Sequence, residues 1–246
     1  MRLDQALMER GLFESREKAR RAVMAGLVEV EGRRVDKPGA AVRAEAALRV
    51  IAPAEPFVSR GGRKLAAALD HFSVDPSGLR CLDVGASTGG FTDCMLSRGA
   101  MHVTALDVGY GLIDLRLRND PRVTVVERVN ARHLAADAFD EPFALVVMDV
   151  SFISALKVAP AVLPHLALGG SLLVLIKPQF EVGREGVGKG GIVRDEALRR
   201  ETIEKRASEL AALGLELRGT FDSPVAGAEG NVEAFAWLVK PARGAA

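Results

Sequence analysis

Cysteine is scarce in this chain, and its scarcity excludes two classes of protein. The 246 residues include only Cys81 and Cys94, whose spacing suits neither a metal site nor a redox pair. Two cysteines cannot build the disulfide framework that stabilises many small exported domains. We therefore expect a reducing, cytoplasmic compartment.

Long apolar runs are also missing. A helix needs about 20 apolar residues to cross a membrane, and the longest apolar run, residues 166–176, is interrupted by Gly169, Gly170 and Ser171. The first residues, MRLDQALMERG, carry acids and arginines where a signal peptide has an apolar core. The sequence therefore predicts neither a membrane anchor nor export by that route.

Net charge is nearly absent, but the charges are unevenly distributed. The formal net charge is +1, yet residues 1–64 hold 14 Lys and Arg against 9 Asp and Glu, and the remainder holds 19 against 23. A local basic surface can bind phosphate in a chain that is neutral overall. The length fits either one large domain or a main domain of about 180 residues with a module of about 60.

The sequence of residues 1–50 predicts two helices followed by small strands. Leu3, Leu7 and Met8 recur at helical spacing, and Ser15 can cap a second helix that runs to Ala25. The letters LVEV, EG and RRV then predict a tight hairpin. The second helix is basic, which by itself is typical of any solvated helix face.

This stretch resembles the RNA-binding module first seen in ribosomal protein S-four, with its basic second helix and its V-x-V-x-G-x-x-V hairpin. The resemblance implies docking on folded RNA through phosphate contacts. The residues expected on the RNA are Arg2, Arg16, Lys18, Arg20 and Arg21. Residues 53–58, PAEPFV, are expected to be a linker with few apolar contacts. We therefore expect a module with its linker over residues 1–57 and a second domain over residues 58–246.

From Gly61 onward, apolar segments alternate with helical ones. The expected strands cover residues 80–84, 102–107, 122–126, 143–149, 171–177, 215–221 and 232–239, and the expected helices include 92–98 and 195–213. This alternation predicts a doubly wound α/β sheet with a ligand crevice at the carboxyl ends of its parallel strands. Chemistry is expected at that edge.

The segment CLDVGASTGGFTD, residues 81–93, combines a strand, a glycine-rich turn and the start of a helix. Glycine allows positive φ and close approach of a ligand, and a helix N-terminus offers free amide groups. The dinucleotide fingerprint would need glycine where Ser87 stands, and no Gly-Lys-Ser/Thr follows as in a phosphate-binding loop.

The same segment resembles the first motif of S-adenosylmethionine-dependent methyltransferases. The resemblance implies a Rossmann-like class I methyltransferase sheet with an antiparallel last strand, S-adenosylmethionine as cofactor, and no metal. It places Asp107 at the cofactor ribose and Asn130 near the adenine. The cofactor-binding residues that it implies are Asp83, Gly85, Ser87, Thr88, Gly89, Gly90, Phe91, Asp107, Asn130 and Asp149. Each acid alone could simply mark the end of a strand. The acids and glycines together, in the order in which the family has them, favour a cofactor site.

Charged residues also end the apolar strands of this domain. Asp149 ends the fourth strand, and Lys177 ends the fifth, where a lone lysine could simply mark the exit into solvent. If the last strand is antiparallel, Glu233 at its start lies at the same edge, and Lys64, one turn into the helix before the first strand, can reach it. These four catalytic candidates match the Lys-Asp-Lys-Glu tetrad of FtsJ-type ribose 2′-O-methyltransferases.

With the DVSFIS segment and the leading RNA module, the resemblance extends to the TlyA family, whose members are called haemolysins or rRNA 2′-O-methyltransferases, and covers essentially the whole chain. It implies methylation of a cytidine ribose in ribosomal RNA or ribosomal subunits. A hydroxyl is a poor nucleophile at neutral pH and needs a base or a positive charge beside it. Lys177 is expected to meet that need, either as a neutral amine favoured by burial or as a charged group that orients the oxygen.

The other tetrad members are expected to support this step. Asp149 is expected near the sulfonium methyl, and Lys64 and Glu233 are expected to orient Lys177 and the ribose. The loop EVGREGVGKGGI, residues 181–192, holds five glycines and is either a connection or a segment that orders over RNA. In the second case, which we favour, Arg184 and Lys189 contact phosphate.

Rival functions fit this sequence less well. An amino-methylating base methyltransferase would show Asn/Asp-Pro-Pro-aromatic after the fourth strand, where residues 149–152 are DVSF. A carbon-methylating enzyme needs a nucleophilic cysteine at that edge, but Cys81 opens a strand at the other end and Cys94 lies in a helix. A haemolytic protein would need an amphipathic lipid-facing surface. A non-catalytic RNA-binding scaffold would not need Lys177 at the end of an apolar strand.

Overall fold

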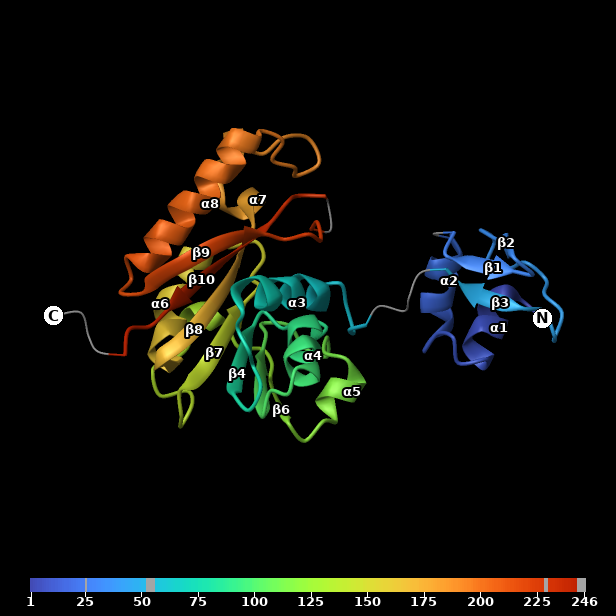
Figure 1. Ribbon diagram of the computed structural model, residues 1–246, viewed down its shortest axis with the longest axis horizontal. Coiled ribbons are helices and arrows are strands. Elements are labelled where there is room, and N and C mark those ends of the chain that lie inside the picture. The colour runs from blue at the N-terminus through green and yellow to red at the C-terminus, as the bar shows by residue number, and fades with distance from the viewer. Residues whose placement is uncertain (25, 52–55, 228–229, 243–246) are drawn as a thin grey trace. The chain divides into compact units, whose positions relative to one another are not determined.

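The computed structural model describes residues 1–24, 26–51, 56–227 and 230–242 (Figure 1). Contacts divide the chain into two compact units, Met1–Pro56 and Phe57–Ala246, a boundary one residue before the one expected from the sequence. Residues 53–55 of the expected linker lie outside the described residues. Each unit has a hydrophobic core of its own and is described separately.

The small unit packs two helices against a three-stranded sheet of order β2-β1-β3. Its elements are α1 (Leu3–Glu9), α2 (Arg16–Met24), β1 (Val28–Val30), β2 (Arg33–Arg34) and β3 (Leu48–Val50). The Oγ of Ser15 accepts the Lys18 N–H at 3.3 Å, so this residue caps α2 as predicted, whereas the expected end at Ala25 lies outside the described residues. The predicted hairpin turns at Glu31 and Gly32, both with positive φ.

Asp4 is a buried acid in the first helix of the small unit. Its carboxylate accepts hydrogen bonds from the Nε atoms of Arg2 and Arg16 at 3.0 and 3.1 Å. The hydrogen bond from Arg2, together with that from Arg16, lowers the pKa of Asp4 to about 2. Arg2 and Arg16, which the sequence predicted only as RNA contacts, therefore also hold this unit together.

The large unit is built on one seven-stranded sheet of order β6-β5-β4-β7-β8-β10-β9. Its strands are β4 (Arg80–Val84), β5 (His102–Leu106), β6 (Val123–Val126), β7 (Phe143–Met148), β8 (Leu166–Ile176), β9 (Glu216–Asp222) and β10 (Ala234–Val239). β10 is antiparallel to both of its neighbours, and the other neighbouring strands are parallel. The predicted α/β sheet with an antiparallel last strand is confirmed, so the start of β10 lies at the edge where the parallel strands end.

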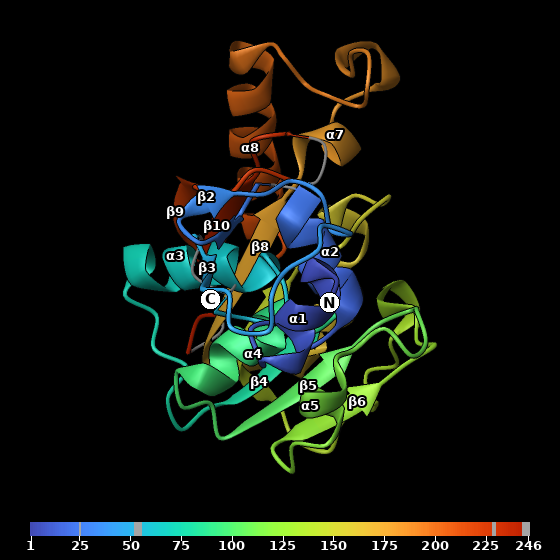
Figure 2. The same cartoon turned by 90° about the vertical axis from the view of Figure 1, so that its right-hand side faces the viewer.

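Helices cover both faces of this sheet. They are α3 (Gly61–Phe72), α4 (Gly90–Ser97), α5 (Leu115–Arg118), α6 (Ala159–Val162), α7 (Pro178–Glu181) and α8 (Glu196–Ala211), with short 3-10 turns η1 (Ala131–His133), η2 (Ala155–Lys157), η3 (Leu163–His165) and η4 (Arg184–Gly186). Asp195 caps α8, because its side chain accepts the N–H groups of Ala197 and Leu198. In both ribbon views, α8 and β6 lie at opposite edges of the unit (Figure 2).

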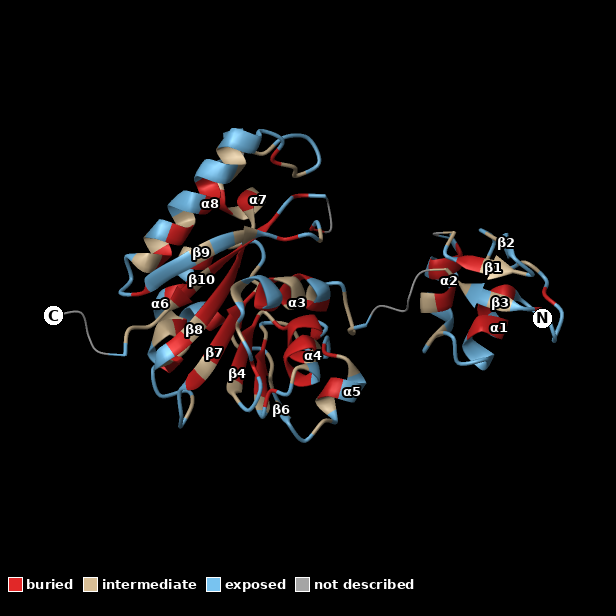
Figure 3. Ribbon diagram, viewed as in Figure 1, coloured by how far each residue is buried: buried red, intermediate tan, exposed pale blue. Residues whose placement is uncertain are grey.

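Alternate residues of the central strands enter two cores, one on each face of the sheet. Leu82 and Val174 pack with residues of α6 and α8, whereas Cys81 and Leu173 pack with residues of α3 and α4. Strands β4, β7 and β8 are accordingly buried along most of their length (Figure 3). A sheet buried on both faces explains the continuous apolar runs of these strands.

Two strands begin at least two residues away from the predicted start, and the other strand boundaries agree within one residue. β8 begins at Leu166 rather than Ser171, because Gly169 takes a φ of 74° within the strand and its N–H donates to the carbonyl of Lys240 at 2.7 Å. Glycine thus bends this strand instead of ending it. β10 begins at Ala234, so Glu233 directly precedes the strand.

Phe57 and Val58, which the sequence assigned to the linker, belong to the large unit. Both side chains pack against its core, and the Phe57 ring occupies the space that a Cβ on Gly62 would need. The Val58 N–H also donates to Asp93 Oδ2 at 2.8 Å. The prediction of few apolar contacts is therefore wrong for these two residues, since a glycine at the start of α3 leaves room for an aromatic ring.

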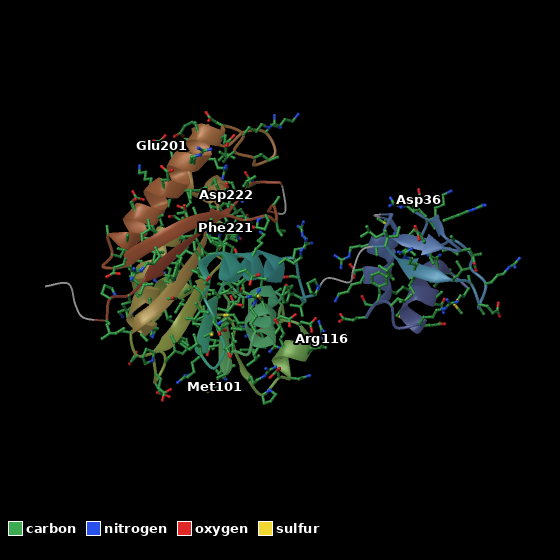
Figure 4. All side chains as sticks on the ribbon, in the orientation of Figure 1. Asp36, Met101, Arg116, Glu201, Phe221 and Asp222 are labelled. Carbon is green, nitrogen blue, oxygen red and sulfur yellow. The ribbon has the colours of Figure 1, made fainter. Side chains whose placement is uncertain are left out.

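The outer edge of the sheet is tied to α8. Phe221 and Asp222 are the last residues of β9 (Figure 4), and the guanidinium of Arg199 on α8 donates to both Asp222 oxygens, at 2.9 and 3.0 Å.

Among the described residues, no helix is long and apolar enough to cross a membrane.

Candidate active site

The four predicted catalytic residues lie together at the carboxyl edge of the sheet. They line one cleft of about 500 Å³. Asp149 directly follows β7 and Lys177 directly follows β8, which are parallel neighbours. Glu233 directly precedes β10, and Lys64 stands in the first turn of α3. Residues that are up to 169 positions apart in the chain thus face one cavity.

The tetrad forms two lysine–carboxylate pairs. Lys177 Nζ lies 2.5 Å from Asp149 Oδ1, and Lys64 Nζ lies 2.5 Å from Glu233 Oε2. The side chain of Glu233 is 3% exposed, whereas that of Asp149 is 22% exposed. The Lys64–Glu233 pair is therefore the more enclosed, and the Lys177–Asp149 pair is the one more open to a ligand.

The glycine-rich turn lies directly beside these pairs. Gly85 has a φ of 86°, and a Cβ on it would meet the backbone carbonyl oxygen of Asp149. A Cβ on Gly90, the first residue of α4, would meet Ser59 Oγ and, at 3.0 Å, the backbone nitrogen of Gly62. Glycine is thus needed at both positions so that the turn can pack closely against the end of β7 and the start of α3.

A second cleft of about 360 Å³ continues from the first. Gly85, Ser87 and Asp149 line both clefts, and Asp107 and Asn130 line the second. The carboxylate of Asp107 accepts the Ser87 N–H at 2.7 Å and the Gly109 N–H at 2.6 Å, which fixes its orientation. Asn130 Oδ1 accepts the Arg132 N–H at 3.1 Å, so its amide nitrogen is the group left for a ligand. An elongated ligand can therefore reach from Asn130 to the tetrad.

Two predicted cofactor-binding residues lie beneath the turn instead of on a cleft surface. Asp83 is completely buried, and its Oδ2 accepts a hydrogen bond from the Thr92 hydroxyl at 2.7 Å. Gly89 has a φ of 93° and packs under Ile113 and Leu117. Neither lines the two clefts, whereas Thr88 and Phe91 line the first as expected.

Burial raises the pKa of Asp83 to about 7, and the charge of Asp149 adds to the increase. The pKa in the folded state thus lies above its unfolded value of 3.8. The stability that Asp83 contributes is fully present below its unfolded pKa and is lost as the pH rises through about 7.

This pKa predicts how the stability of the protein depends on pH. We compare the free energy of unfolding of the wild type with that of the Asp83→Asn variant. As the pH rises from about 4 to about 8, we expect the wild-type value to fall by a few kcal/mol relative to that of the variant. Urea unfolding of both proteins at the two pH values measures this difference, and a difference that does not change with pH would contradict it.

Several residues of the cleft were not predicted from the sequence. They include Arg60, Ser151, Phe152, Gln179 and Phe180. The side chain of Phe152 is 90% exposed at a φ of 64°, and its ring lies 5.1 Å from that of Phe180. The DVSFIS segment held the signal, because it directly follows a predicted buried strand at the sheet edge where the catalytic residues were expected.

The predicted RNA contacts in α2 differ in how far they are already engaged. Lys18 pairs with Glu14 at 2.5 Å, and Arg21 lies 3.8 Å from Glu17. Arg20 is exposed and makes no ion pair with a described residue. Arg33 and Arg34 on β2 are also exposed, although they were not predicted as RNA contacts.

The glycine-rich loop after β8 is held by Asn231. The side chain of Asn231 accepts the Val193 N–H at 2.9 Å and donates to the Gly191 carbonyl at 2.8 Å. Lys189 is exposed on this loop, and the side chain of Arg184 lies outside the described residues. The loop therefore has anchors within the chain, in addition to any that RNA supplies.

Comparison with known proteins agrees with this geometry. The model of the FtsJ-like methyltransferase family matches residues 57–240, and that of the S4 domain matches residues 1–48. The chain is 47% identical over 238 residues to the 16S/23S rRNA (cytidine-2′-O)-methyltransferase TlyA of Mycobacterium tuberculosis, across 96% of this chain and 89% of that protein. It is 40% identical to Hemolysin A of Brachyspira hyodysenteriae, across 97% of this chain and 100% of that protein.

A solved structure of a hemolysin-named protein from Streptococcus thermophilus has the same fold. It matches with a TM-score of 0.78 at 40% identity and covers 98% of this chain and 88% of that one. The family model spans most of the chain, and these relatives span nearly all of it. As the sequence predicted, the chain belongs to the FtsJ-like methyltransferase family, in the group that carries an N-terminal S4 domain and includes TlyA.

Proposed function

We propose that this protein transfers a methyl group from S-adenosylmethionine to the ribose 2′-hydroxyl of a cytidine in ribosomal RNA. The observation that carries the proposal is the pair of lysine–carboxylate contacts in one cleft beside the glycine-rich turn. The substrate class is that named for the M. tuberculosis relative. The reaction belongs in the cytoplasm, where ribosomal RNA is processed.

The residues of the two clefts fit S-adenosylmethionine. Gly85 leaves the turn free of a side chain where the ligand must approach, and the amide groups at the start of α4 suit a carboxylate. The carboxylate of Asp107 retains lone pairs for ribose hydroxyls, and the amide nitrogen of Asn130 suits the acceptors of an adenine. Asp149 lines both clefts and would lie near the sulfonium. Bound there, the cofactor supplies an activated methyl group and leaves as an uncharged thioether.

The Lys177–Asp149 pair acts on the attacking hydroxyl. Lys177 Nζ lies 2.5 Å from Asp149 Oδ1, within ion-pair distance of the carboxylate. Of the two roles that the sequence left open for Lys177, we therefore propose the charged one: its ammonium orients the ribose oxygen and stabilises the negative charge that develops on it. As the new oxygen–carbon bond forms, the hydroxyl proton passes to the Asp149 carboxylate, because a charged Lys177 has no lone pair to accept it. Lys64 and Glu233 form the more enclosed pair and line the same cleft.

The surroundings of the tetrad favour ribose over base as the methylated group. Burial raises the pKa of the Cys81 and Cys94 thiols to about 12, so neither supplies the thiolate that carbon methylation of a base needs. Phe152 and Phe180 present aromatic rings at the cleft. A nucleobase stacked on such a ring gains about 1–3 kcal/mol, and its ribose is then the part left to face the lysines.

Incubation with isotope-labelled S-adenosylmethionine tests this function. Ribosomal subunits and protein-free ribosomal RNA serve as substrates, and the RNA is then digested to nucleosides and separated. We expect label in 2′-O-methylcytidine. Label in a methylated base would replace the proposal by base methylation, and an absence of label on both substrates would favour a non-catalytic RNA-binding protein.

The S4 domain is proposed to supply RNA affinity through exposed cations such as Arg20. Replacing Arg20 with alanine should weaken binding to ribosomal RNA and reduce the slope of log affinity against log salt by about 1 for a lost phosphate contact. Titrations at several salt concentrations measure both quantities. The matched control is Arg218→Ala, because Arg218 lies on β9 and pairs with Glu216 at 2.6 Å. Equal salt slopes for the two variants would remove Arg20 from the interface.

A further inference from the structure

Ser151 contacts the lysine at the centre of the proposed chemistry. Lys177 Nζ donates to Ser151 Oγ at 2.7 Å, in addition to its 2.5 Å contact with Asp149. Ser151 also lines both clefts, so it stands where the proposed cofactor and target sites meet. It is not a member of the Lys-Asp-Lys-Glu tetrad.

A hydrogen bond to Ser151 and an ion pair with Asp149 restrict the orientation of the Lys177 ammonium. A lysine has a flexible four-carbon chain with about 2 kcal/mol of rotamer entropy, and a single acceptor leaves its ammonium free to rotate. An ammonium is tetrahedral, so the hydrogen bond to Ser151 fixes the direction of one N–H and, with the nearby Asp149 carboxylate, restricts where the other two point. The ammonium of Lys64, by contrast, makes its hydrogen bond and ion pair with Glu233 alone among the described residues. Ser151 thus orients the lysine of the pair that is the more open to a ligand.

The segment that carries Ser151 is tied to the segment that carries Lys177 by a buried carboxylate. Four residues further along, the Ala155 N–H donates to Oε1 of the buried Glu181 at 2.9 Å, and Glu181 Oε2 lies 2.9 Å from Arg206 Nε on α8. Glu181 itself follows Lys177 in α7. One carboxylate therefore ties the segment after β7, which carries Ser151, to the segment after β8, which carries Lys177.

We propose that Ser151 is a positioning residue that acts through Lys177, a proposal that rests on the proposed ribose methylation. Its hydroxyl accepts one ammonium hydrogen and so directs another toward the substrate oxygen. Alignment of this kind acts in the transition state, because small misplacements of a reacting group lower the rate more than they lower binding. The expected signature is therefore a slower chemical step with unchanged affinity for cofactor and RNA.

Three variants of the full-length protein test this role. Ser151→Ala should lower the single-turnover rate constant for methyl transfer about 10- to 100-fold, the usual range for a lost hydrogen bond to a charged group. Ser151→Thr should recover most of the rate, because it keeps the hydroxyl and Ser151 is exposed enough to accept a methyl group. The matched control is Ser154→Ala from the same DVSFIS segment. Ser154 Oγ accepts the Leu156 N–H at 3.3 Å and lines neither cleft, so its loss should leave the rate within about twofold.

Cofactor affinity by calorimetry, RNA affinity and the thermal midpoint are measured alongside the rate. A Ser151→Ala protein with the wild-type rate, or one whose affinities fall while its rate at saturation is unchanged, would overturn the positioning role. A threonine variant as slow as the alanine variant would overturn it too. If the wild type itself places no label in ribose, the proposed function fails instead, so the two failures are distinguishable.

Discussion

Replacing Lys177 with alanine should lower the rate of methyl transfer by about 10³-fold or more, while the affinity for S-adenosylmethionine stays nearly unchanged. Lys177 faces the cleft at the end of β8, and the residues expected to hold the cofactor lie on the glycine-rich turn and after β5, β6 and β7. Removal of the ammonium takes away the charge that stabilises the ribose oxygen but none of these cofactor contacts. Single-turnover transfer to ribosomal RNA and calorimetric titration of the cofactor measure the two effects separately.

Lys157→Ala is the matched control for this variant. Lys157 is an exposed lysine of η2 and does not line the two clefts, so its replacement should leave the rate of transfer within about twofold of the wild type. Normal turnover by Lys177→Ala would end the assignment of this lysine to the reaction. A loss of cofactor binding as large as the loss of rate would show that Lys177 serves the cofactor and not the hydroxyl.

The meeting of the tetrad could be predicted because it follows from strand order. Apolar runs that end in Asp149 and Lys177 indicate buried parallel strands, and the carboxyl ends of such strands share one edge. Placing Glu233 at that edge required the antiparallel last strand, which came from the family resemblance and which β10 confirms. A charged residue at the end of a buried strand is therefore informative once the direction of the strand is known.

The pairing of these side chains could not be predicted, because it depends on distances that strand order does not determine. Lys64 pairs with Glu233 and Lys177 pairs with Asp149, but the sequence suits the opposite pairing equally well. The contact of Lys177 with Ser151 depends on the chain after β7, a connection without periodicity. Packing contacts such as the Phe57 ring against Gly62 were missed for the same reason.

Replacing Gly85 with alanine should weaken the binding of S-adenosylmethionine about 100-fold, the second large effect that we expect. The backbone φ of 86° disfavours a side chain, and the new Cβ would meet the carbonyl oxygen of Asp149. Because that atom belongs to the backbone, relief requires a shift of the turn or of the chain at Asp149. Gly85 and Asp149 line both clefts, so either shift disturbs the cofactor site and the lysine pair together.

The matched control separates backbone strain from the steric contact. Gly214 has a φ of 93°, but a Cβ on it would meet no atom within 4 Å, and it lies between α8 and β9. Gly214→Ala should therefore lose about 1 kcal/mol of stability from the strained φ and keep its affinity for the cofactor. Calorimetric titration and thermal unfolding of both variants measure the two quantities. If Gly85→Ala binds the cofactor as tightly as Gly214→Ala does, the turn is not the cofactor cradle, because the close approach of Gly85 to Asp149 would then serve packing alone.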